Sequence, residues 1–268
     1  MPSALIATRT DDLTDGLTVG YDDKGSGPAL VLVHGHPFDR SMWAPQLAAF
    51  SATHRVIAPD LRGYGASTVV PGTTRLSDFA TDLAALLDQL GVPRFVLGGL
   101  SMGGQIAMEC YRLFPERITG LVLADTFPAA ETEEGKVWRN AMADRLLREG
   151  MRGYADEVRD TMVAPYNTEA SETVHRMMLA APPEGAAAAL RGRAERPDYR
   201  ELLTRVPVPV LVVVGRDDAY TPVADAEAMH AAIPDSTLCV IEGAAHMPNL
   251  ERPEEFDAAL RAYLERLS

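Results

Sequence analysis

One stretch, FVLGGLSMGGQIAM from Phe95 to Met108, limits what this chain can fold into more than any other. An apolar β-rich run stops at two glycines, a single hydroxyl follows at Ser101, and two more glycines precede a second apolar segment. Gly99 and Gly103 lie two residues on either side of the serine, where side chains would collide in a sharp turn. The stretch therefore predicts a strand, a tight turn and a helix.

A glycine-rich turn between a strand and a helix can also carry an incidental serine. With a strand before it and a helix after it, however, G-x-S-x-G is the pattern of a nucleophile elbow. Such a turn lifts the hydroxyl above the sheet and aims the first amides of the helix at it. We therefore interpret Ser101 as a candidate nucleophile.

The rest of the chain alternates strand-like and helix-like segments. Besides 94–99, five short β-rich runs have the composition of buried parallel strands. These runs are 28–35, 54–60, 118–125, 208–215 and 236–243. Amphipathic helices separate them, for example after residue 77, where Ser77 is the expected N-cap and Gly91 the C-terminal stop. The alternation predicts an α/β fold, with a mostly parallel sheet covered by helices on both faces.

One region breaks this alternation. Residues 128–205 contain no strand-like run and read as a series of helical segments. A simple crossover between parallel strands needs only about a dozen residues, so we favour an inserted helical cap over one elaborate crossover. The expected organisation is a core of residues 1–127 and 206–268 with a cap of residues 128–205.

Composition excludes several classes of function. Hydrophobic residues make up 47% of the 268 residues, and the formal net charge of −13 argues against a nucleic-acid partner. No apolar run approaches the roughly 18 to 20 residues that span a bilayer, so no membrane partner is expected. The N-terminus lacks a signal-peptide pattern, and two cysteines, Cys110 and Cys239, make no disulfide framework. These features predict a cytoplasmic location.

A serine hydroxyl needs a base and a group that orients the base. Asp217 and Asp218 directly follow the run 208–215, and His246 follows the run 236–243. Active-site groups of α/β folds collect at these carboxyl ends of strands. We expect His246 to take the serine proton and one of the two aspartates to hold its ring.

Several motifs together carry a resemblance to a known family. They are HGHP (34–37), PDLRGYGAS (59–67), GLSMG (99–103), GRDDAYTP (215–222) and GAAHMPNLERPEEF (243–256). With them, nearly the whole chain resembles the α/β-hydrolase superfamily, especially its capped members. That subgroup includes carboxylesterases, enol-lactone hydrolases, C–C bond hydrolases, cofactor-free haloperoxidases, epoxide hydrolases and haloalkane dehalogenases. The last two use an elbow aspartate, so Ser101 favours acyl transfer.

The resemblance also selects among the carboxylates. Family members commonly read G-x-x-D-x-x-x-P after the penultimate strand, and Gly215, Asp218 and Pro222 match that spacing. Asp218 is therefore the expected acid, and Asp217 a solvated neighbour. Asp125 occupies the position from which some relatives recruit their acid, and it remains an alternative.

Backbone amides should form the oxyanion hole. Met102 supplies one at the start of the helix, and His36 the other, because Pro37 has no N–H. His34 and His36 could suggest a metal pair, but no matching cluster of ligands accompanies them. We therefore expect no metal, and no motif predicts a cofactor.

The substrate is less constrained. Phe38, Phe127, Trp138, Tyr220 and the side chain of Met102 are candidate apolar pocket walls, although Trp138 could instead pack within the cap. They suggest a small to medium carboxylic ester or lactone, cleaved through an acyl-enzyme. Open alternatives are a C–C bond hydrolase or a cofactor-free perhydrolase with the same triad, and a non-catalytic ligand receptor. The oligomeric state stays open.

Overall fold

The computed structural model describes residues 3–6 and 16–267. Most of the N-terminal segment behind the signal-peptide expectation therefore lies outside the described residues. None of the described helices is both long enough and apolar enough to cross a membrane.

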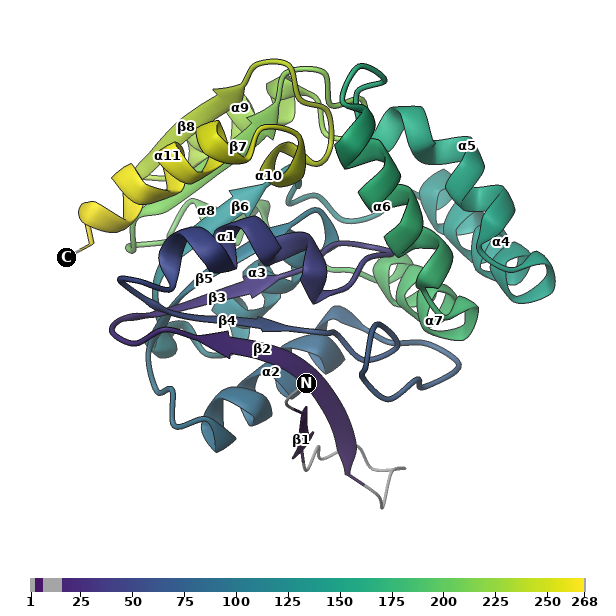
Figure 1. Ribbon diagram of the computed structural model, residues 1–268, viewed down its shortest axis with the longest axis horizontal. Helices are drawn as coiled ribbons and strands as arrows, with labels where there is room; N and C mark the ends of the chain where they lie inside the picture. The colour runs from purple at the N-terminus through teal and green to yellow at the C-terminus, as the bar shows by residue number, and fades with distance from the viewer. Residues whose placement is uncertain (1–2, 7–15, 268) are drawn as a thin grey trace.

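The described chain forms one eight-stranded sheet (Figure 1). Its strands are β1 (Ser3–Ile6), β2 (Leu17–Lys24), β3 (Ala29–Val33), β4 (Arg55–Pro59), β5 (Phe95–Leu100), β6 (Ile118–Ala124), β7 (Val210–Gly215) and β8 (Ser236–Ile241). They lie in the order β1-β2-β4-β3-β5-β6-β7-β8. From β4 to β8 all neighbours pair in parallel, whereas β1 pairs with β2, and β2 with β4, in the antiparallel sense. The predicted mostly parallel sheet is confirmed.

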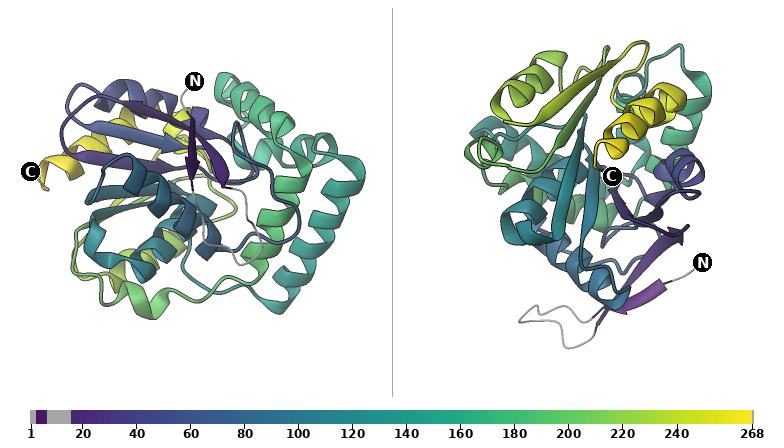
Figure 2. Two further views of the ribbon diagram at one scale, coloured as in Figure 1. Left: turned by 90° about the horizontal axis from the view of Figure 1, so that it is seen from below. Right: turned by 90° about the vertical axis from the view of Figure 1, so that its left-hand side faces the viewer.

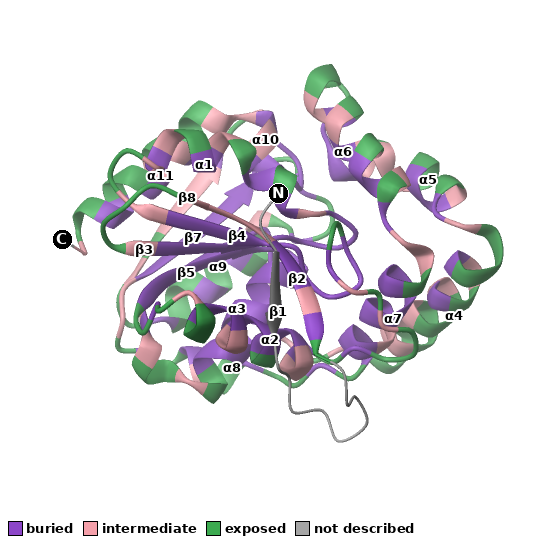
Figure 3. Ribbon diagram, turned by 60° about the horizontal axis from the view of Figure 1, so that its bottom comes forward, coloured by how far each residue is buried: buried purple, intermediate pink, exposed green. Residues whose placement is uncertain are grey.

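Helices cover both faces of this sheet. Those of the core are η1 (Arg40–Trp43), α1 (Ala44–Phe50), α2 (Leu76–Gln89), α3 (Met102–Leu113), η2 (Pro115–Arg117), α8 (Arg200–Leu203), α9 (Val223–Ala232), α10 (Pro248–Glu251) and α11 (Pro253–Glu265). Successive residues of β3 show the two layers, because Val31 packs into the cluster with Phe79 of α2 and Leu32 into the cluster with Leu47 of α1. Figure 3 shows the buried strands between partly exposed helices. A strand covered on both faces is apolar throughout.

The six strands predicted from β-rich runs are all present, with ends shifted by one or two residues. The sequence analysis missed β1 and β2, at the antiparallel edge of the sheet. One predicted cap was wrong: α2 begins at Leu76 with Arg75 as N-cap, and Ser77 lies inside the first turn. The reason is that the Asp78 carboxylate accepts the Arg75 N–H at 2.7 Å, which satisfies this end of the helix. Gly91 ends the helix as expected, at a φ of 66°.

Four helices stand apart from the sheet between β6 and β7. They are α4 (Glu133–Glu149), α5 (Arg152–Met162), α6 (Thr168–Ala180) and α7 (Pro183–Ala194). Figures 1 and 2 show them together beside one end of the core. The short α8, within the predicted range 128–205, instead contacts α9 of the core. That range as a separate cap domain stays a prediction.

Candidate active site

Ser101 lies in a strained turn between β5 and α3. Its φ of 57° and ψ of −116° are unusual for a residue with a side chain. Two hydrogen bonds hold the turn: the Ser101 N–H donates to Ala124 O at 2.9 Å, and the side-chain hydroxyl of Thr126 donates to Ser101 O at 2.8 Å. Strain of this kind persists only where the surroundings fix it, and it collects at functional sites.

The flanking glycines are required by close backbone approach. A Cβ on Gly99 would lie 2.1 Å from the carbonyl oxygen of Gly103, and one on Gly103 would lie 2.1 Å from that of Val33. Both distances are far shorter than any real contact, and both involve backbone that cannot swing away. The turn predicted from FVLGGLSMGG is therefore sharp for the stated steric reason.

Asp218 and His246 form a buried pair on neighbouring loops. Asp218 follows β7 and His246 follows β8, and Nδ1 of His246 lies 2.7 Å from Oδ2 of Asp218. The other carboxylate oxygen, Oδ1, accepts from the N–H groups of Tyr220 and Thr221 at 2.8 and 3.1 Å. Burial alone would raise the pKa of Asp218, but the charge and hydrogen bond of His246, and the hydrogen bonds from the hydroxyl and N–H of Thr221, lower it to about 2. Asp218 is thus an anion that holds the imidazole through Nδ1.

Asp217 lies apart from this pair. It is exposed, and its carboxylate accepts from the hydroxyl of Tyr166 on the outside of the molecule. Of the two adjacent aspartates, only Asp218 reaches His246 among the described hydrogen bonds.

Asp125 is close to the pair but differently bound. It follows β6 at a φ of 45°, and its Oδ1 accepts from the N–H of Gly215 at 2.9 Å. Its Oδ2 is buried with no hydrogen-bond donor among the described residues. Burial, and then the neighbouring Asp218 charge, raise the pKa of Asp125 well above its ordinary value. The pKa values of these two neighbouring carboxyl groups are thus shifted in opposite directions.

Ser101 and His246 line one cavity of about 180 Å³ under the four helices. No hydrogen bond joins their side chains among the described residues, and catalytic hydrogen bonds often tighten only when substrate binds. The edge of the Tyr220 ring lies against the His246 ring, with centroids 5.1 Å apart. The other lining residues are His36, Phe127, Trp138, Arg139, Tyr154, Met162, Leu190, Arg193, Tyr220 and Thr221.

This lining includes three of the residues suggested as pocket walls and excludes two. Phe127, Trp138 and Tyr220 line the cavity. Phe38 does not, because its ring is buried in the core layer with Trp43. The Met102 side chain is likewise fully buried in the opposite layer. Both positions follow strand ends, but their side chains fill the space beside the sheet.

The sequence analysis missed the two arginines of the cavity, Arg139 and Arg193. Arg139 lies on α4 and Arg193 on α7, in segments interpreted only as cap helices. The sequence pattern could have indicated Arg193. It lies one helical turn after Leu190 on an alanine-rich helix, so it shares the apolar, buried face of that helix.

The two amides expected at the oxyanion hole are available. Neither the N–H of Met102 nor that of His36 donates in the turns, loops and caps of the described chain. Met102 is the first residue of α3, so its N–H has no acceptor within the helix. His36 also lines the cavity.

The histidines near β3 are engaged with the protein. Nδ1 of His34 bonds to Gly35 O at 2.8 Å and its Nε2 accepts from the Leu61 N–H at 2.9 Å. Nδ1 of His36 bonds to the Tyr64 hydroxyl at 2.7 Å. With both nitrogens of His34 in use, the two rings are not arranged as a metal pair.

One group of described side chains is close enough to share a metal ion. Asp125, Asp218 and His246 place a ligand atom each within 4.8 Å of one another. The His246–Asp218 hydrogen bond and the bond from Gly215 to Asp125 already use three of their atoms. This donor set fits a hydrogen-bonded carboxylate–histidine pair better than a metal.

Glu251 on α10 fixes the loop that carries His246. Its Oε1 accepts from the N–H groups of Ala245 and Met247, on either side of the histidine, at 2.9 and 3.1 Å. Its Oε2 accepts from Ala164 N and Asn167 Nδ2, between α5 and α6, at 2.9 and 2.8 Å. One buried carboxylate thus ties the His246 loop to the four-helix segment.

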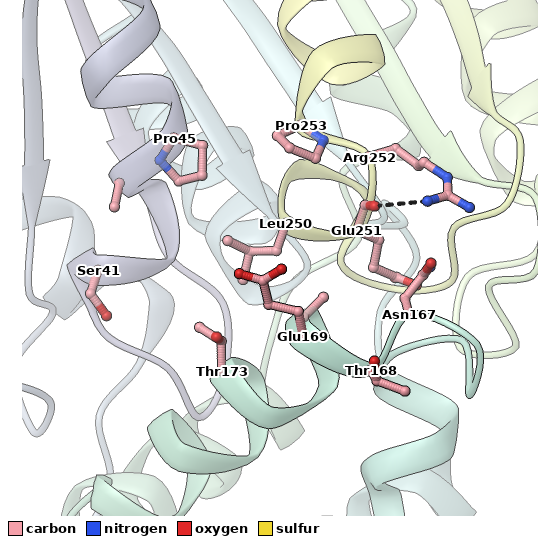
Figure 4. Close-up of a pocket in the computed structure, with 12 residues that line it drawn as sticks. Ser41, Pro45, Asn167, Thr168, Glu169, Thr173, Leu250, Glu251, Arg252 and Pro253 are labelled. Carbon is pink, nitrogen blue, oxygen red and sulfur yellow. Dashed lines mark hydrogen bonds between the residues drawn. The ribbon is translucent and has the colours of Figure 1, made fainter.

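A larger groove of about 540 Å³ lies on the outside of this junction (Figure 4). It runs between α6 and the start of α1, with Glu169 and Thr173 on one side and Ser41 and Pro45 on the other. No member of the Ser101, Asp218 and His246 set lines it. Ser101 and His246 line the smaller inner cavity instead.

Known proteins share this architecture. A family model described as the alpha/beta hydrolase family matches residues 30–259. The 3-oxoadipate enol-lactonase 2 of Acinetobacter baylyi is 33% identical over 97% of this chain and 96% of its own length.

Solved structures of an esterase and an enol-lactonase also superpose on this chain. A thermophilic esterase from Thermogutta terrifontis, solved with malate bound, superposes with a TM-score of 0.97 at 39% identity, covering 100% of this chain and 99% of the other. The enol-lactonase from Burkholderia xenovorans superposes at 0.85 with 28% identity, over 93% of this chain and 97% of its own. Together with the match over residues 30–259, these likenesses place the chain in the alpha/beta hydrolase family.

Proposed function

We propose that this protein cleaves a small to medium carboxylic ester or lactone through an acyl-enzyme on Ser101. As a member of a family with esterase and enol-lactonase relatives, the chain is a carboxylic ester hydrolase. The observation that carries the mechanism is the strained turn at Ser101 in one cavity with a buried His246–Asp218 pair.

In the first half of the reaction, Ser101 Oγ attacks the carbonyl carbon while its proton passes to Nε2 of His246. The amides of Met102 and His36 donate to the oxygen that becomes negative. When the C–O bond breaks, His246 returns the proton to the leaving alkoxide. Asp218 stabilises the imidazolium throughout.

In the second half, water attacks the acyl-enzyme and His246 accepts its proton. The carboxylic acid leaves as the Ser101 hydroxyl is restored. For a lactone, the released alcohol remains attached to the acyl group and departs with it. The cavity of about 180 Å³ supports a small acyl group.

The test removes the nucleophile and compares the adjacent aspartates. Ser101→Ala should keep the fold and lower kcat for 4-nitrophenyl acetate by about 10³-fold or more, since only binding and the oxyanion donors remain. Asp218→Asn should cost about 10⁴-fold, because the imidazole loses its tautomer. Asp217→Asn is the matched control and should stay within about twofold of wild type. A serine-reactive phosphonate should label Ser101 in wild type. Undiminished hydrolysis by Ser101→Ala would refute the proposal.

A further inference from the structure

The cavity beside Ser101 has an unusual charge for this protein. The chain has a formal net charge of −13, yet no carboxylate is among the described residues that line the cavity. Two guanidinium groups, those of Arg139 and Arg193, line it instead. The charged side chains of the cavity lining, apart from the histidines, are therefore both cationic.

Arg193 is buried without a counter-charge. It is 8% exposed, and its Nε donates to Oε1 of Gln105 on α3 at 3.1 Å. None of the ion pairs of the described chain includes it. Buried charges are otherwise paired, because leaving one unpaired is costly. The hydrogen bond to Gln105 fixes the guanidinium beside α3 and leaves both Nη groups available to donate to a ligand.

The carboxylate near Arg193 is already paired with two other arginines. Arg139 and Arg196 share the single carboxylate of Glu131, with Nη1 of Arg196 at 2.7 Å from it. Three guanidinium groups thus have one carboxylate between them. Burial first, and then the charges of Arg139 and Arg196, hold the pKa of Arg193 well below its usual range. An anion bound at Arg193 would relieve this repulsion.

A second unpartnered polar atom lies on the same lining. Nε2 of His36 is buried with no hydrogen-bond partner among the described residues. Burial and the charge of Arg193 hold the pKa of His36 well below its usual range, so the ring is neutral. Nδ1 of this ring lies 2.7 Å from the Tyr64 hydroxyl, and when Nδ1 accepts from that hydroxyl the proton of the neutral ring is on Nε2. In that tautomer His36 offers one more donor to a bound anion.

We propose that Arg193 binds a free carboxylate of the substrate, so that this enzyme's preferred substrates are anionic half-esters or carboxy-lactones. The proposal rests on the proposed function, because it places that carboxylate relative to Ser101. The two Nη groups of a guanidinium match the two oxygens of a carboxylate. The small cavity restricts the carboxylate to a few carbon atoms from the scissile carbonyl.

The test compares two esters that differ only in charge. Monomethyl glutarate carries a carboxylate where methyl glutaramate carries a neutral amide of nearly the same shape. For wild type, kcat/KM measured by methanol release should be about ten- to hundredfold higher for the half-ester, the range of one charge-assisted hydrogen bond. 4-Nitrophenyl acetate serves as a neutral reference for the chemistry.

Variants then assign the preference to one side chain. Arg193→Met should lower kcat/KM for monomethyl glutarate by about ten- to hundredfold and change the amide ester by less than about threefold. Arg193→Lys keeps the charge but loses the two-pronged geometry, and should recover part of the loss. The matched control is Arg191→Met on the same helix, where the side chain pairs with Asp144 outside the cavity. It should leave both esters unchanged.

A binding measurement separates the subsite from the chemistry. Calorimetry should show glutarate binding to Ser101→Ala, and binding at least about tenfold weaker when Arg193→Met is added. Equal kcat/KM for the two esters in wild type would overturn the anion subsite while leaving the proposed function intact. Failure to hydrolyse any ester would overturn the proposed function, and glutarate binding would still decide the subsite. Because the wild-type comparison needs no variant, it decides between these outcomes even if Arg193→Met does not fold.

Discussion

At the scale of single residues, the site depends on three carboxylates in different states. Asp218 is held ionised by His246 and by donors from Thr221. Burial, and then the Asp218 charge, raise the pKa of Asp125 beside it well above its ordinary value. Asp217 is exposed and accepts from Tyr166. Adjacent acidic residues thus differ because desolvation and neighbours act on each one separately.

The raised pKa of Asp125 makes stability fall with rising pH. A group whose pKa is higher in the folded state contributes stability that is complete below its unfolded pKa, about 3.9, and is lost as pH rises through the folded pKa. Asp125→Asn keeps an acceptor for Gly215 and removes this titration. The unfolding free energy of wild type should therefore fall relative to the variant by up to about 1.4 kcal/mol per pH unit above pH 4.

Urea unfolding of both proteins from pH 5 to 8 tests this. Asp218 does not interfere with this measurement. Its pKa is lowered to about 2, so the stability that it contributes is lost only as pH falls from about 4 toward 2, and it is fully present from pH 5 to 8. Parallel stability curves for wild type and Asp125→Asn would show that Asp125 titrates normally.

At the scale of elements, strand register and one short helix set the site. Leu100 and Ala124, the last residues of β5 and β6, pair with each other, whereas Ala124 pairs with Val213, two residues before the end of β7. This register brings Ser101 and Asp125 together. The last component, His246, depends on α10, whose Glu251 accepts the amides on both sides of it.

Glu251→Gln should therefore weaken both the fold and the catalysis. The amide nitrogen that replaces one oxygen cannot accept, so at least two of the four donors lose their partner. An unsatisfied buried donor costs about 1 to 3 kcal/mol, so two of them predict a loss of about 2 to 6 kcal/mol in unfolding free energy. We expect kcat to fall by about tenfold or more as His246 loses its orientation.

The control for this variant is Glu254→Gln, an exposed glutamate three residues later. Its unfolding free energy should stay within about 0.5 kcal/mol of wild type. Denaturant unfolding and steady-state kinetics on both variants give the comparison. A Glu251→Gln protein with unchanged kcat well below its melting temperature would show that the His246 loop is held by other contacts.

At the scale of the whole molecule, the proposed catalytic residues follow strands of the sheet, and α4, α5 and α7 supply half of the residues that line the cavity. Ser101, Asp218 and His246 follow strands, whereas Trp138, Tyr154 and Arg193 come from α4, α5 and α7. Such a division lets the helices select substrates without moving the reacting groups. It also means that changes in these helices should alter specificity before they alter the reaction.

Trp138→Ala tests this division. Trp138 lines the cavity but is 49% exposed, so its removal should change the melting temperature little. Each buried methylene contributes about 0.8 kcal/mol of binding, and we expect kcat/KM for bulky esters to fall by roughly tenfold while 4-nitrophenyl acetate changes little. A substrate series and a melting curve on the same variant decide whether Trp138 contacts the substrate or packs between helices. A uniform loss of activity with a lower melting temperature would instead assign Trp138 to packing between helices.

The sequence by itself determined the six parallel strands and which residues follow them, because strand patterns and glycine spacing are local properties of the chain. Ser101, Asp218 and His246 could therefore be named before their contacts were known. Only the tertiary structure decided that Phe38 packs into the core, that Asp125 lies beside Asp218 and that Arg193 faces the cavity. These facts depend on how segments far apart in the chain pack and on which buried groups lack a partner, and no local pattern encodes either.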